Sequence, residues 1–343
     1  MKRIKELDFT RVIAMFAVVM IHVTSTYINQ DSSFILFDMN LAFILNQVSR
    51  FSVPLFIVLS GISLGFSKPI GDPLLFYKKR LVKIGIPYLF WFTAYYVYNN
   101  HNNLAAMTLG SFVKEFLLGQ SAPHLYFIII IFQLYILFPF LKNAISKSSW
   151  SVLIISFVIS YSIEKLFFFL QYDVDLIPAF IRPYLWILFP TWLFYFVFGL
   201  VLCQNLFSKF EAFCTQHFSA VFVATGLITI FYVLESRITN SLESIKAPLN
   251  IYTIFILVFL FSLWSLIGRY SIIQKAVDFF AKHSLTIYFE HVFVLYFLRR
   301  FSFFNRGMSG MILLFITVIV VASLVAYCVD SLVHKISKIK APE

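Results

Sequence analysis

The chain has 343 residues, of which 60% are hydrophobic and only 13% are charged, with a mean hydropathy of +0.87. These values exclude a water-soluble globular protein and indicate a protein with several membrane spans. A net charge of +11 would suggest a nucleic-acid partner in a soluble protein. Here the cations lie in short segments beside apolar runs, where membrane orientation and anionic lipid headgroups account for them, so we expect no nucleic acid.

Apolar runs long enough to cross the hydrocarbon core as helices recur along the chain, without the alternating pattern of a membrane β-barrel. Ten spans are predicted, at 9–29, 41–66, 84–100, 125–142, 150–170, 185–205, 217–236, 250–268, 285–300 and 309–333. The run at 285–300 is short enough to be tilted or re-entrant. We therefore expect an all-α integral membrane protein with about ten transmembrane helices.

The basic residues predict the orientation of these spans. With the N-terminus in the cytoplasm, about seventeen Lys and Arg residues fall on the cytoplasmic side and about eight outside, so both termini are predicted to be cytoplasmic. The first run resembles a signal peptide, but it contains Arg11 and His22 and no small-x-small cleavage site follows it. We expect it to be retained as a span.

The chain is expected to form one polytopic membrane domain over residues 1–343, with no appended soluble domain, because no internal repeat or long hydrophilic block interrupts it. Its three cysteines are widely spaced and form no Cys-x-x-Cys pair. They are expected to be inert thiols, and no metal site is predicted. The sequence does not indicate an oligomeric state, and a homo-oligomer is left open.

Arg11 and His22 are the strongest candidates for chemistry, because a charge inside the bilayer is costly and is usually kept for a function. Eleven residues of helix return to within about 20° of the same azimuth and rise about 16 Å, so both side chains share one stripe. Arg11 could instead be an interfacial anchor, and His22 a neutral imidazole bonded between helices. Taken together, they offer a guanidinium for phosphate or carboxylate and a base for a hydroxyl.

Five segments, in order along the chain, resemble the membrane-bound acyltransferase 3 family of bacterial surface-polysaccharide O-acyltransferases. They are Leu7-Asp8-x-x-Arg11-x-x-Ala14 with His22 eleven residues after Arg11, Ser52 to Gly61, Phe76 to Tyr88, His124-Leu125-Tyr126-Phe127, and Ile287-Tyr288-Phe289-Glu290-His291. The resemblance covers about residues 6–300. The chain departs from the family pattern at Lys83, Tyr126 and Val292, where arginine, tryptophan and proline are common.

This resemblance implies transfer of an acyl group, acetyl first and succinyl second, from cytosolic acyl-CoA to a hydroxyl of a cell-surface polysaccharide or lipid-linked sugar. It also implies a multi-pass protein of the bacterial cytoplasmic membrane that is in contact with membrane lipids. A partner protein from glycan synthesis is left open. His22 would be the general base, and Arg11, Arg80 and Lys83 would bind the CoA phosphates. Acyl-CoA is expected as a co-substrate, with no permanently bound cofactor.

The other candidate residues each have a structural explanation as well as a functional one. Tyr288 and His291 could orient the acceptor or stabilise an oxyanion, or form a satisfied interfacial pair. Ser60 is a candidate for contact with the acyl-CoA, although Gly61-x-x-x-Gly65 beside it is typical of helix packing. The candidates for binding the acceptor are His124, Glu164, Arg182 and Arg299, and for the two arginines outer-leaflet anchoring explains the charges equally well.

The main alternative is a polysaccharide or lipid-linked glycan exporter that transfers no acyl group, since buried cations could also line a translocation path. Paired half-repeats or matching broken helices would favour such a transporter, and the sequence has neither. A silent sensor or scaffold is a third reading. It would tolerate loss of His22, whereas an enzyme would not.

Overall fold

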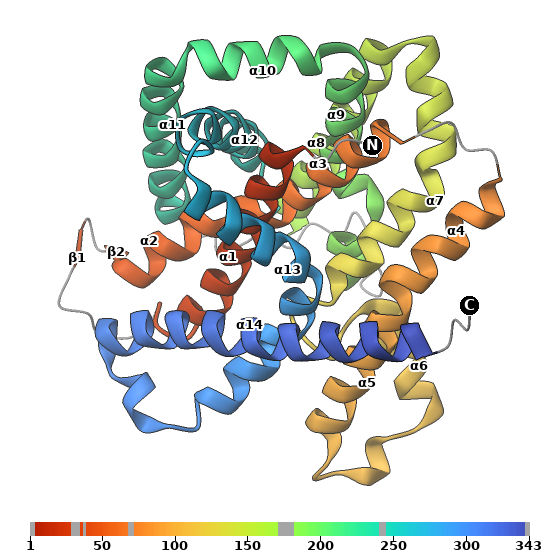
Figure 1. The fold of residues 1–343 in the computed structure, drawn as a ribbon, viewed down its shortest axis with the longest axis vertical. Helices are drawn as coiled ribbons and strands as arrows, with labels where there is room; N and C mark the ends of the chain where they lie inside the picture. Colours follow the sequence, from red (N-terminus) through yellow and green to blue (C-terminus); the bar gives the residue numbers. More distant parts are fainter. Residues whose placement is uncertain are drawn as a thin grey trace. The chain divides into compact units, whose positions relative to one another are not determined.

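The computed structural model describes residues 4–28, 35–36, 39–67, 72–170, 182–239 and 245–339, and these are almost entirely helical (Figure 1). The helices are α1 (Lys5–Thr24), α2 (Leu41–Val48), α3 (Ser52–Gly65), α4 (Pro73–Arg80), α5 (Ile86–Asn100), α6 (Leu109–Leu118), α7 (Tyr126–Lys147), α8 (Ser149–Leu170), α9 (Phe189–Val201), α10 (Phe207–Gln216), α11 (Phe218–Ile238), α12 (Ala247–Ile267), α13 (Ser271–Leu298) and α14 (Gly307–Ile339). Short 3₁₀ turns are η1 (Ser49–Phe51), η3 (Leu104–Ala106), η4 (Arg182–Ile187) and η6 (Ser302–Asn305); η2 (Leu81–Gly85) and η5 (Leu202–Leu206) are π-turns. Two-residue strands β1 (Ile35–Leu36) and β2 (Met39–Asn40) pair antiparallel.

Within these described ranges, eight helical segments are long and apolar enough to cross a membrane. They are Lys5–Thr24, Leu41–Gly65, Tyr126–Lys147, Ser149–Leu166, Tyr184–Gln204, Phe218–Ile238, Ala247–Ile267 and Gly307–Val333. The other two predicted spans, 84–100 and 285–300, fall on α5 and α13, which do not meet both requirements. The helical membrane architecture is therefore confirmed, while ten spans and cytoplasmic termini stay predictions.

The start of α13 differs from the prediction. A short span at 285–300 was expected, yet one continuous helix begins at Ser271 and runs for 28 residues. Charged residues in its first half interrupt the apolar pattern on which the prediction depended. Two of its polar side chains have partners, because Asp278 pairs with Lys5 and His283 with Asp330. Tertiary pairing thus extends the helix beyond the apolar run.

The chain divides into two compact units, which are described separately. The first unit holds Met1–Ser52, His217–Leu242 and Phe255–Glu343, and the second holds Val53–Gln216 and Glu243–Ile254. The first therefore contains α1, α2, α11, α13 and α14, and the second contains α3 to α10 apart from the first residue of α3. Helix α12 is divided between the units: residues 247–254 belong to the second and residues 255–267 to the first.

In the first unit, α1 packs along α13 and α14 (Figure 1). Phe16 of α1 meets Phe280 of α13 edge-on, with ring centroids 5.0 Å apart. Ala14 and Val23 are fully buried. At one end of the helix pair Lys5 forms an ion pair with Asp278. The contacts follow the same order along both helices, from Lys5 with Asp278 to His22 with His291, so the far end of α1 lies beside the second half of α13.

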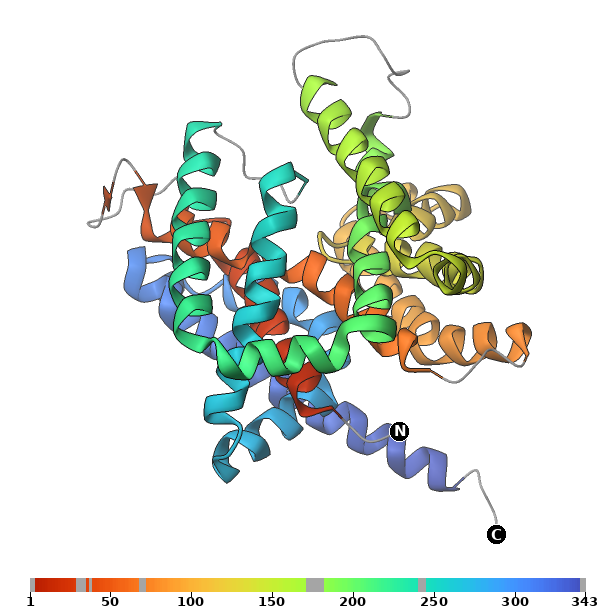
Figure 2. The ribbon, with the colours of Figure 1, turned by 90° about the horizontal axis from the view of Figure 1, so that it is seen from above.

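In the second unit, α8 and α9 lie side by side (Figure 2), and α9 also packs closely on α3. A Cβ at Gly61 would lie 2.3 Å from the carbonyl oxygen of Phe196, and one at Gly199 would lie 2.2 Å from that of Val58. Both distances are too short for any side chain, so the two backbones touch only because glycine stands at both positions. The packing pattern predicted around Gly61 is confirmed.

Candidate active site

The rings of His22 and His291 face each other in the first unit. His22 stands on the last turns of α1 and His291 on the second half of α13, and their ring centroids lie 5.3 Å apart with the planes tilted by 44°. His291 is 1% exposed, whereas His22 is half-buried. The packing of α1 on α13 therefore brings together two predicted catalytic residues that lie near opposite ends of the sequence.

The hydrogen bonds of His291 indicate which of its nitrogens carries a proton. Its Nδ1 lies 2.8 Å from the carbonyl oxygen of Tyr288 and 3.1 Å from that of Ile287. A carbonyl can only accept, so Nδ1 is the donor and Nε2 of the neutral ring keeps the lone pair. This ring nitrogen is suited to accept a proton or to orient a hydroxyl. The Tyr288 ring is buried with its centroid 6.1 Å from that of His291.

Arg299 binds the end of α1. Its Nη2 donates to the carbonyl oxygen of His22 at 2.7 Å and to Oγ1 of Thr26 at 3.1 Å. The last carbonyls of a helix have no partner within the helix and carry partial negative charge, so a guanidinium there satisfies both needs. Arg299 was predicted to bind the acceptor. The structure places it on the backbone of His22, where it holds the turn that carries the imidazole.

Asn46 of α2 holds the same turn from the other side. Its Nδ2 donates to the carbonyl oxygen of Ile21 at 3.1 Å and to Oγ1 of Thr24 at 3.0 Å. Its Oδ1 accepts from Nε and Nη2 of Arg50, at 3.0 and 2.8 Å. The fully buried amide thus connects α1 to a second guanidinium. Fixed partners on both sides restrict rotation of the helix end and therefore of the His22 ring.

Arg299, bonded to the His22 carbonyl oxygen, and Arg50, bonded to Asn46, bring two guanidinium groups to the end of α1 that carries His22. A site with two guanidinium groups beside two imidazoles favours negative charge, such as that on the oxygen of an acyl group under attack. Sequence reasoning did not single out Arg50 or Asn46. Arg50 lies within the predicted span at 41–66, so the cost of an intramembrane charge, which drew attention to Arg11, would have identified it as well.

Arg11 lies on the same helix as His22, as predicted, and about 16 Å from it along the axis. Its Nη1 donates to Oδ1 of Asp8 at 3.0 Å, and the Asp8 side chain is nearly buried. The Arg11 side chain is 31% exposed. One carboxylate engages only part of a guanidinium that has five N–H donors, so Arg11 is oriented by Asp8 and keeps donors for an anionic ligand.

The remaining predicted residues lie in the second unit. Glu164 is 4% exposed and accepts from Nδ2 of Asn250 with both oxygens, at 3.0 and 2.8 Å. His124 is buried, with its ring 5.5 Å from that of Tyr95. Both side chains are therefore buried. Arg182 begins η4, but its side chain lies outside the part of the chain that is described.

Three residues predicted to bind acyl-CoA also belong to the second unit. Ser60 is half-buried on α3, next to the glycine that packs on α9. Arg80 ends α4, and its guanidinium lies over the rings of Phe76 and Tyr135, at 5.3 and 5.4 Å from their centroids. Lys83 is exposed in the π-turn η2. Their binding of CoA stays a prediction.

The sequence model of the family Acyl_transf_3, described as an acyltransferase domain, matches residues 4–329. The chain belongs to this acyltransferase family. The matched range contains every candidate residue from Arg11 to Arg299, in both units. The acyltransferase is also 27% identical over 306 residues to the Bacillus subtilis (strain 168) protein named "Putative membrane-bound acyltransferase YfiQ", a match that covers 85% of this chain and 81% of that protein. No solved structure matches the chain.

Proposed function

We propose that this acyltransferase moves an acyl group, acetyl in the first place and succinyl in the second, from cytosolic acyl-CoA to a hydroxyl of a cell-surface polysaccharide or its lipid-linked sugar precursor. Family membership supports acyl transfer. The observation that carries the proposal is the pair of facing imidazoles of His22 and His291, at an end of α1 that is held by the guanidinium groups of Arg299 and, through Asn46, Arg50. This combination offers a proton acceptor and stabilisation of negative charge at one place.

In the proposed reaction His22 takes the proton of the acceptor hydroxyl. The hydroxyl oxygen then attacks the thioester carbonyl carbon, and the oxygen of that carbonyl becomes negatively charged next to Arg50 and Arg299. The tetrahedral intermediate collapses with breakage of the carbon–sulfur bond, and the proton held by His22 passes to the sulfur. The products are the acyl ester and free CoA thiol, with no net proton gained or lost.

His291 has a positioning role in this mechanism. Its Nδ1 is held by backbone carbonyl oxygens, so the lone pair on Nε2 is fixed in direction. A fixed acceptor beside His22 can bind the acceptor hydroxyl and orient it for loss of its proton. Tyr288, buried beside His291, is proposed to contribute its hydroxyl to the same contact.

Arg11 is proposed to bind the phosphates of acyl-CoA. Its distance from His22 along α1, about 16 Å, suits an extended pantetheine arm between phosphate and thioester. Asp8 orients the guanidinium in the absence of ligand. The donor is a co-substrate released after each turnover, and the protein is proposed to work in the bacterial cytoplasmic membrane with the glycan acceptor.

The test is transfer of radiolabelled acetyl groups from acetyl-CoA into the lipid-linked and polysaccharide fractions of membrane vesicles from the native bacterium. His22→Ala is expected to abolish transfer. His101→Ala is the control, because His101 is exposed at the end of α5, where its Nδ1 bonds the carbonyl oxygen of Tyr98 in its own turn at 2.6 Å. Full transfer by His22→Ala would refute its role as the base.

The glycan exporter remains the alternative, and the same vesicles separate the two functions. The exporter would be favoured if glycan export continued after acetyl-CoA was removed and if no labelled product formed when labelled acetyl-CoA was supplied. Consumption of the thioester that depends on His22 would exclude it. Thermal melting of the purified variants must match the parent, because removal of one member of a buried polar pair can destabilise the fold.

A further inference from the structure

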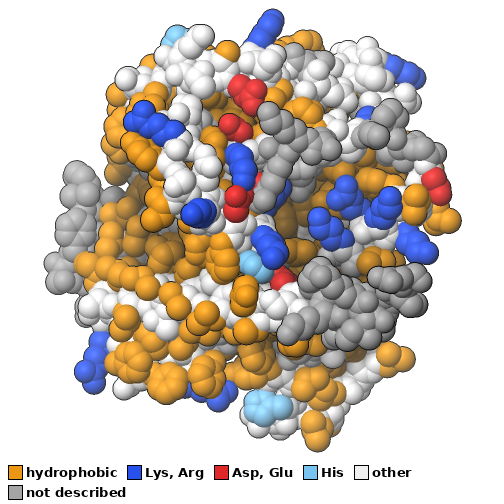
Figure 3. All heavy atoms as spheres, in the orientation of Figure 1, with side chains coloured by type: hydrophobic (Ala, Val, Ile, Leu, Met, Phe, Trp, Pro, Cys, Tyr) orange, Lys and Arg blue, Asp and Glu red, His pale blue; other side chains and the backbone are white. Residues whose placement is uncertain are grey.

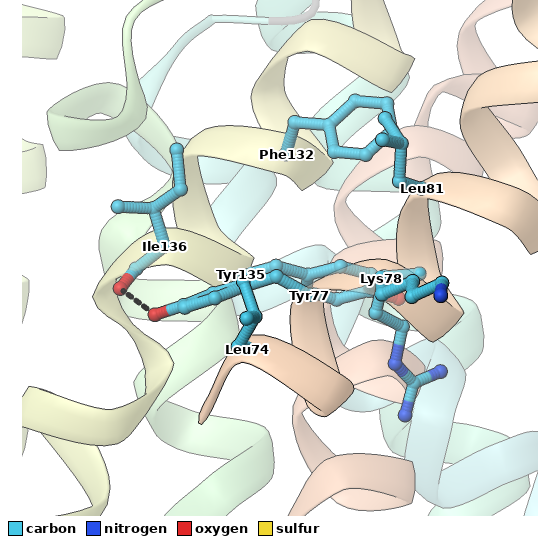
Figure 4. A pocket seen from close by; sticks show the side chains of 8 residues that line it. Leu74, Tyr77, Lys78, Leu81, Phe132, Tyr135 and Ile136 are labelled. Atoms are coloured by element: carbon cyan, nitrogen blue, oxygen red, sulfur yellow. Dashed lines mark hydrogen bonds between the residues drawn. The ribbon is translucent and has the colours of Figure 1, made fainter. Parts of the chain in front are cut away.

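A cavity of about 430 Å³ lies in the second unit, between α4, the π-turn η2 and α7 (Figure 4). Its walls are formed by Leu74, Tyr77, Leu81, Phe132, Tyr135 and Ile136. The walls are almost wholly apolar, and the hydroxyl of Tyr77 is directed at the carbonyl oxygen of Ile136, to which it donates at 3.2 Å. A cavity of this size is within the range of small-ligand sites.

The local sequence produces this cavity. Asp72 caps α4 by accepting from the backbone N–H of Leu74 at 2.9 Å, and Pro73 begins the helix. Pro87 has no N–H to offer the carbonyl of Lys83, and the five residues before Ile86 form a π-turn. Such turns are rare and are frequent at functional sites. Leu81, in this turn, lies next to Phe132 on one side of the cavity (Figure 4).

Two basic residues contribute the carbon atoms of their side chains to the same cavity. Lys78 is exposed, and the half-buried guanidinium of Arg80 is held over Phe76 and Tyr135. Lys79 and Lys83 follow within one and a half turns, and no carboxylate occurs in the sequence between Asp72 and Glu115. Basic side chains gather over α4 and the residues that follow it (Figure 3). The cavity therefore combines an apolar interior with a strongly cationic rim.

The mouth of the cavity opens on an apolar surface. Leu74 is 76% exposed, Leu81 60% and Ile136 58%. In a membrane protein, such side chains are surrounded by lipid. The predicted cytoplasmic position of Lys78 to Lys83 puts the rim at the leaflet that carries anionic phospholipids. The membrane at this level therefore contains phospholipids whose negative headgroups match the cationic rim and whose apolar chains match the interior.

From this cavity and its rim we propose a binding site for an anionic glycerophospholipid, with one acyl chain in the apolar interior and the phosphate on Lys78 and Arg80. The inference goes beyond the acyl-transfer reaction. The nucleotide of CoA fits the interior poorly, because its ribose hydroxyls and adenine amine would lose water without gaining partners on these walls. A saturated chain has no such groups.

The experiment is native mass spectrometry of the purified full-length protein, released from detergent with phosphatidylglycerol or phosphatidylcholine at equal concentration. The parent is expected to retain one phosphatidylglycerol and little phosphatidylcholine. The double variant Lys78→Gln/Arg80→Gln is expected to bind phosphatidylglycerol about 30-fold more weakly. Lys147→Gln/Lys209→Gln, which removes two exposed cations outside the cavity, is expected to bind like the parent.

A second variant tests the apolar interior with the cations intact. Ile136→Trp fills the mouth from a largely exposed position on α7 and leaves the backbone carbonyl that accepts from Tyr77. It is expected to lose the bound lipid. Equal retention of both lipids by the parent, or retention of phosphatidylglycerol by the charge variant, would overturn the proposal. The proposal would also be overturned if CoA displaced the lipid from the parent but did not bind the charge variant. That result would assign Arg80 to binding of the acyl-CoA. Lipid retention measured by mass does not depend on acyl transfer. Failure of the lipid proposal can therefore be distinguished from failure of the proposed acyltransferase function.

Discussion

The guanidinium of Arg299 donates to the carbonyl oxygen of His22 at 2.7 Å, so the residue predicted to bind the acceptor is attached to the backbone of the predicted base. The contact joins the ends of α1 and α13, and beside it the rings of His22 and His291 face each other. A substitution at Arg299 therefore acts on the position of the imidazole even if no ligand contacts the arginine.

Arg299→Ala is expected to lower the free energy of unfolding by about 1.5–3 kcal/mol, because helix carbonyls lose a charged donor. Arg299→Lys should recover part of this loss. Thermal unfolding and the Michaelis constants of both variants check the prediction. If Arg299 only steered the acceptor, KM for the acceptor would rise while the melting temperature stayed at the parent value.

His291→Ala is expected to reduce kcat about a hundredfold, as can follow when a group that orients the reacting hydroxyl is lost. His291→Gln should retain more activity, because an amide can still bind a hydroxyl. Steady-state kinetics with saturating acetyl-CoA measure both. Unchanged kcat in His291→Ala, in a variant that melts like the parent, would leave His22 to act without this partner.

Arg11→Ala is expected to abolish thermal stabilisation of the purified protein by CoA and acetyl-CoA. A ligand at about 100 times its dissociation constant stabilises the folded state by about 2.7 kcal/mol, so the effect on the melting temperature is measurable. Arg269→Ala is a suitable control, because Arg269 is exposed and interacts with its neighbour Tyr270. Parent-like stabilisation of Arg11→Ala by CoA would place the phosphate site elsewhere.

Gly199→Ala is expected to destabilise the second unit by about 1–3 kcal/mol or more, because the new Cβ would meet the carbonyl oxygen of Val58 at 2.2 Å. Gly226→Ala provides the matched control on α11, where nothing lies within 4 Å of the added carbon. Alanine is the better helix former, so Gly226→Ala should leave stability unchanged or raise it by up to about 1 kcal/mol. Equal melting of the two variants would contradict the close contact of α3 and α9.

The sequence predicted those features that depend on local periodicity. Long apolar runs indicated the helices, and the eleven-residue spacing indicated that Arg11 and His22 share one helix, which α1 confirms. The order of the motifs predicted the family, which the family match confirms. These features can be read from neighbouring residues because helix geometry relates positions along one stretch of chain.

Features that depend on tertiary partners were not predicted. Asn46 is an ordinary polar residue in an apolar run, and its importance follows only from the carbonyl of Ile21 and from Arg50. The start of α13 was missed because the ion pair between Lys5 and Asp278 joins residues far apart in sequence. Both cases require knowledge of which helices pack together.

The ion pair of Lys5 with Asp278 and the bond of Arg299 to His22 lie at opposite ends of α1. Two contacts with α13 at opposite ends of α1 oppose both sliding and twisting of one helix against the other. A slip of a single residue would move one helix by about 1.5 Å and turn it by about 100° against the other, which would separate the two imidazoles. The pair of histidines therefore behaves as part of a fixed frame, and motion that admits substrates must come from elements outside it.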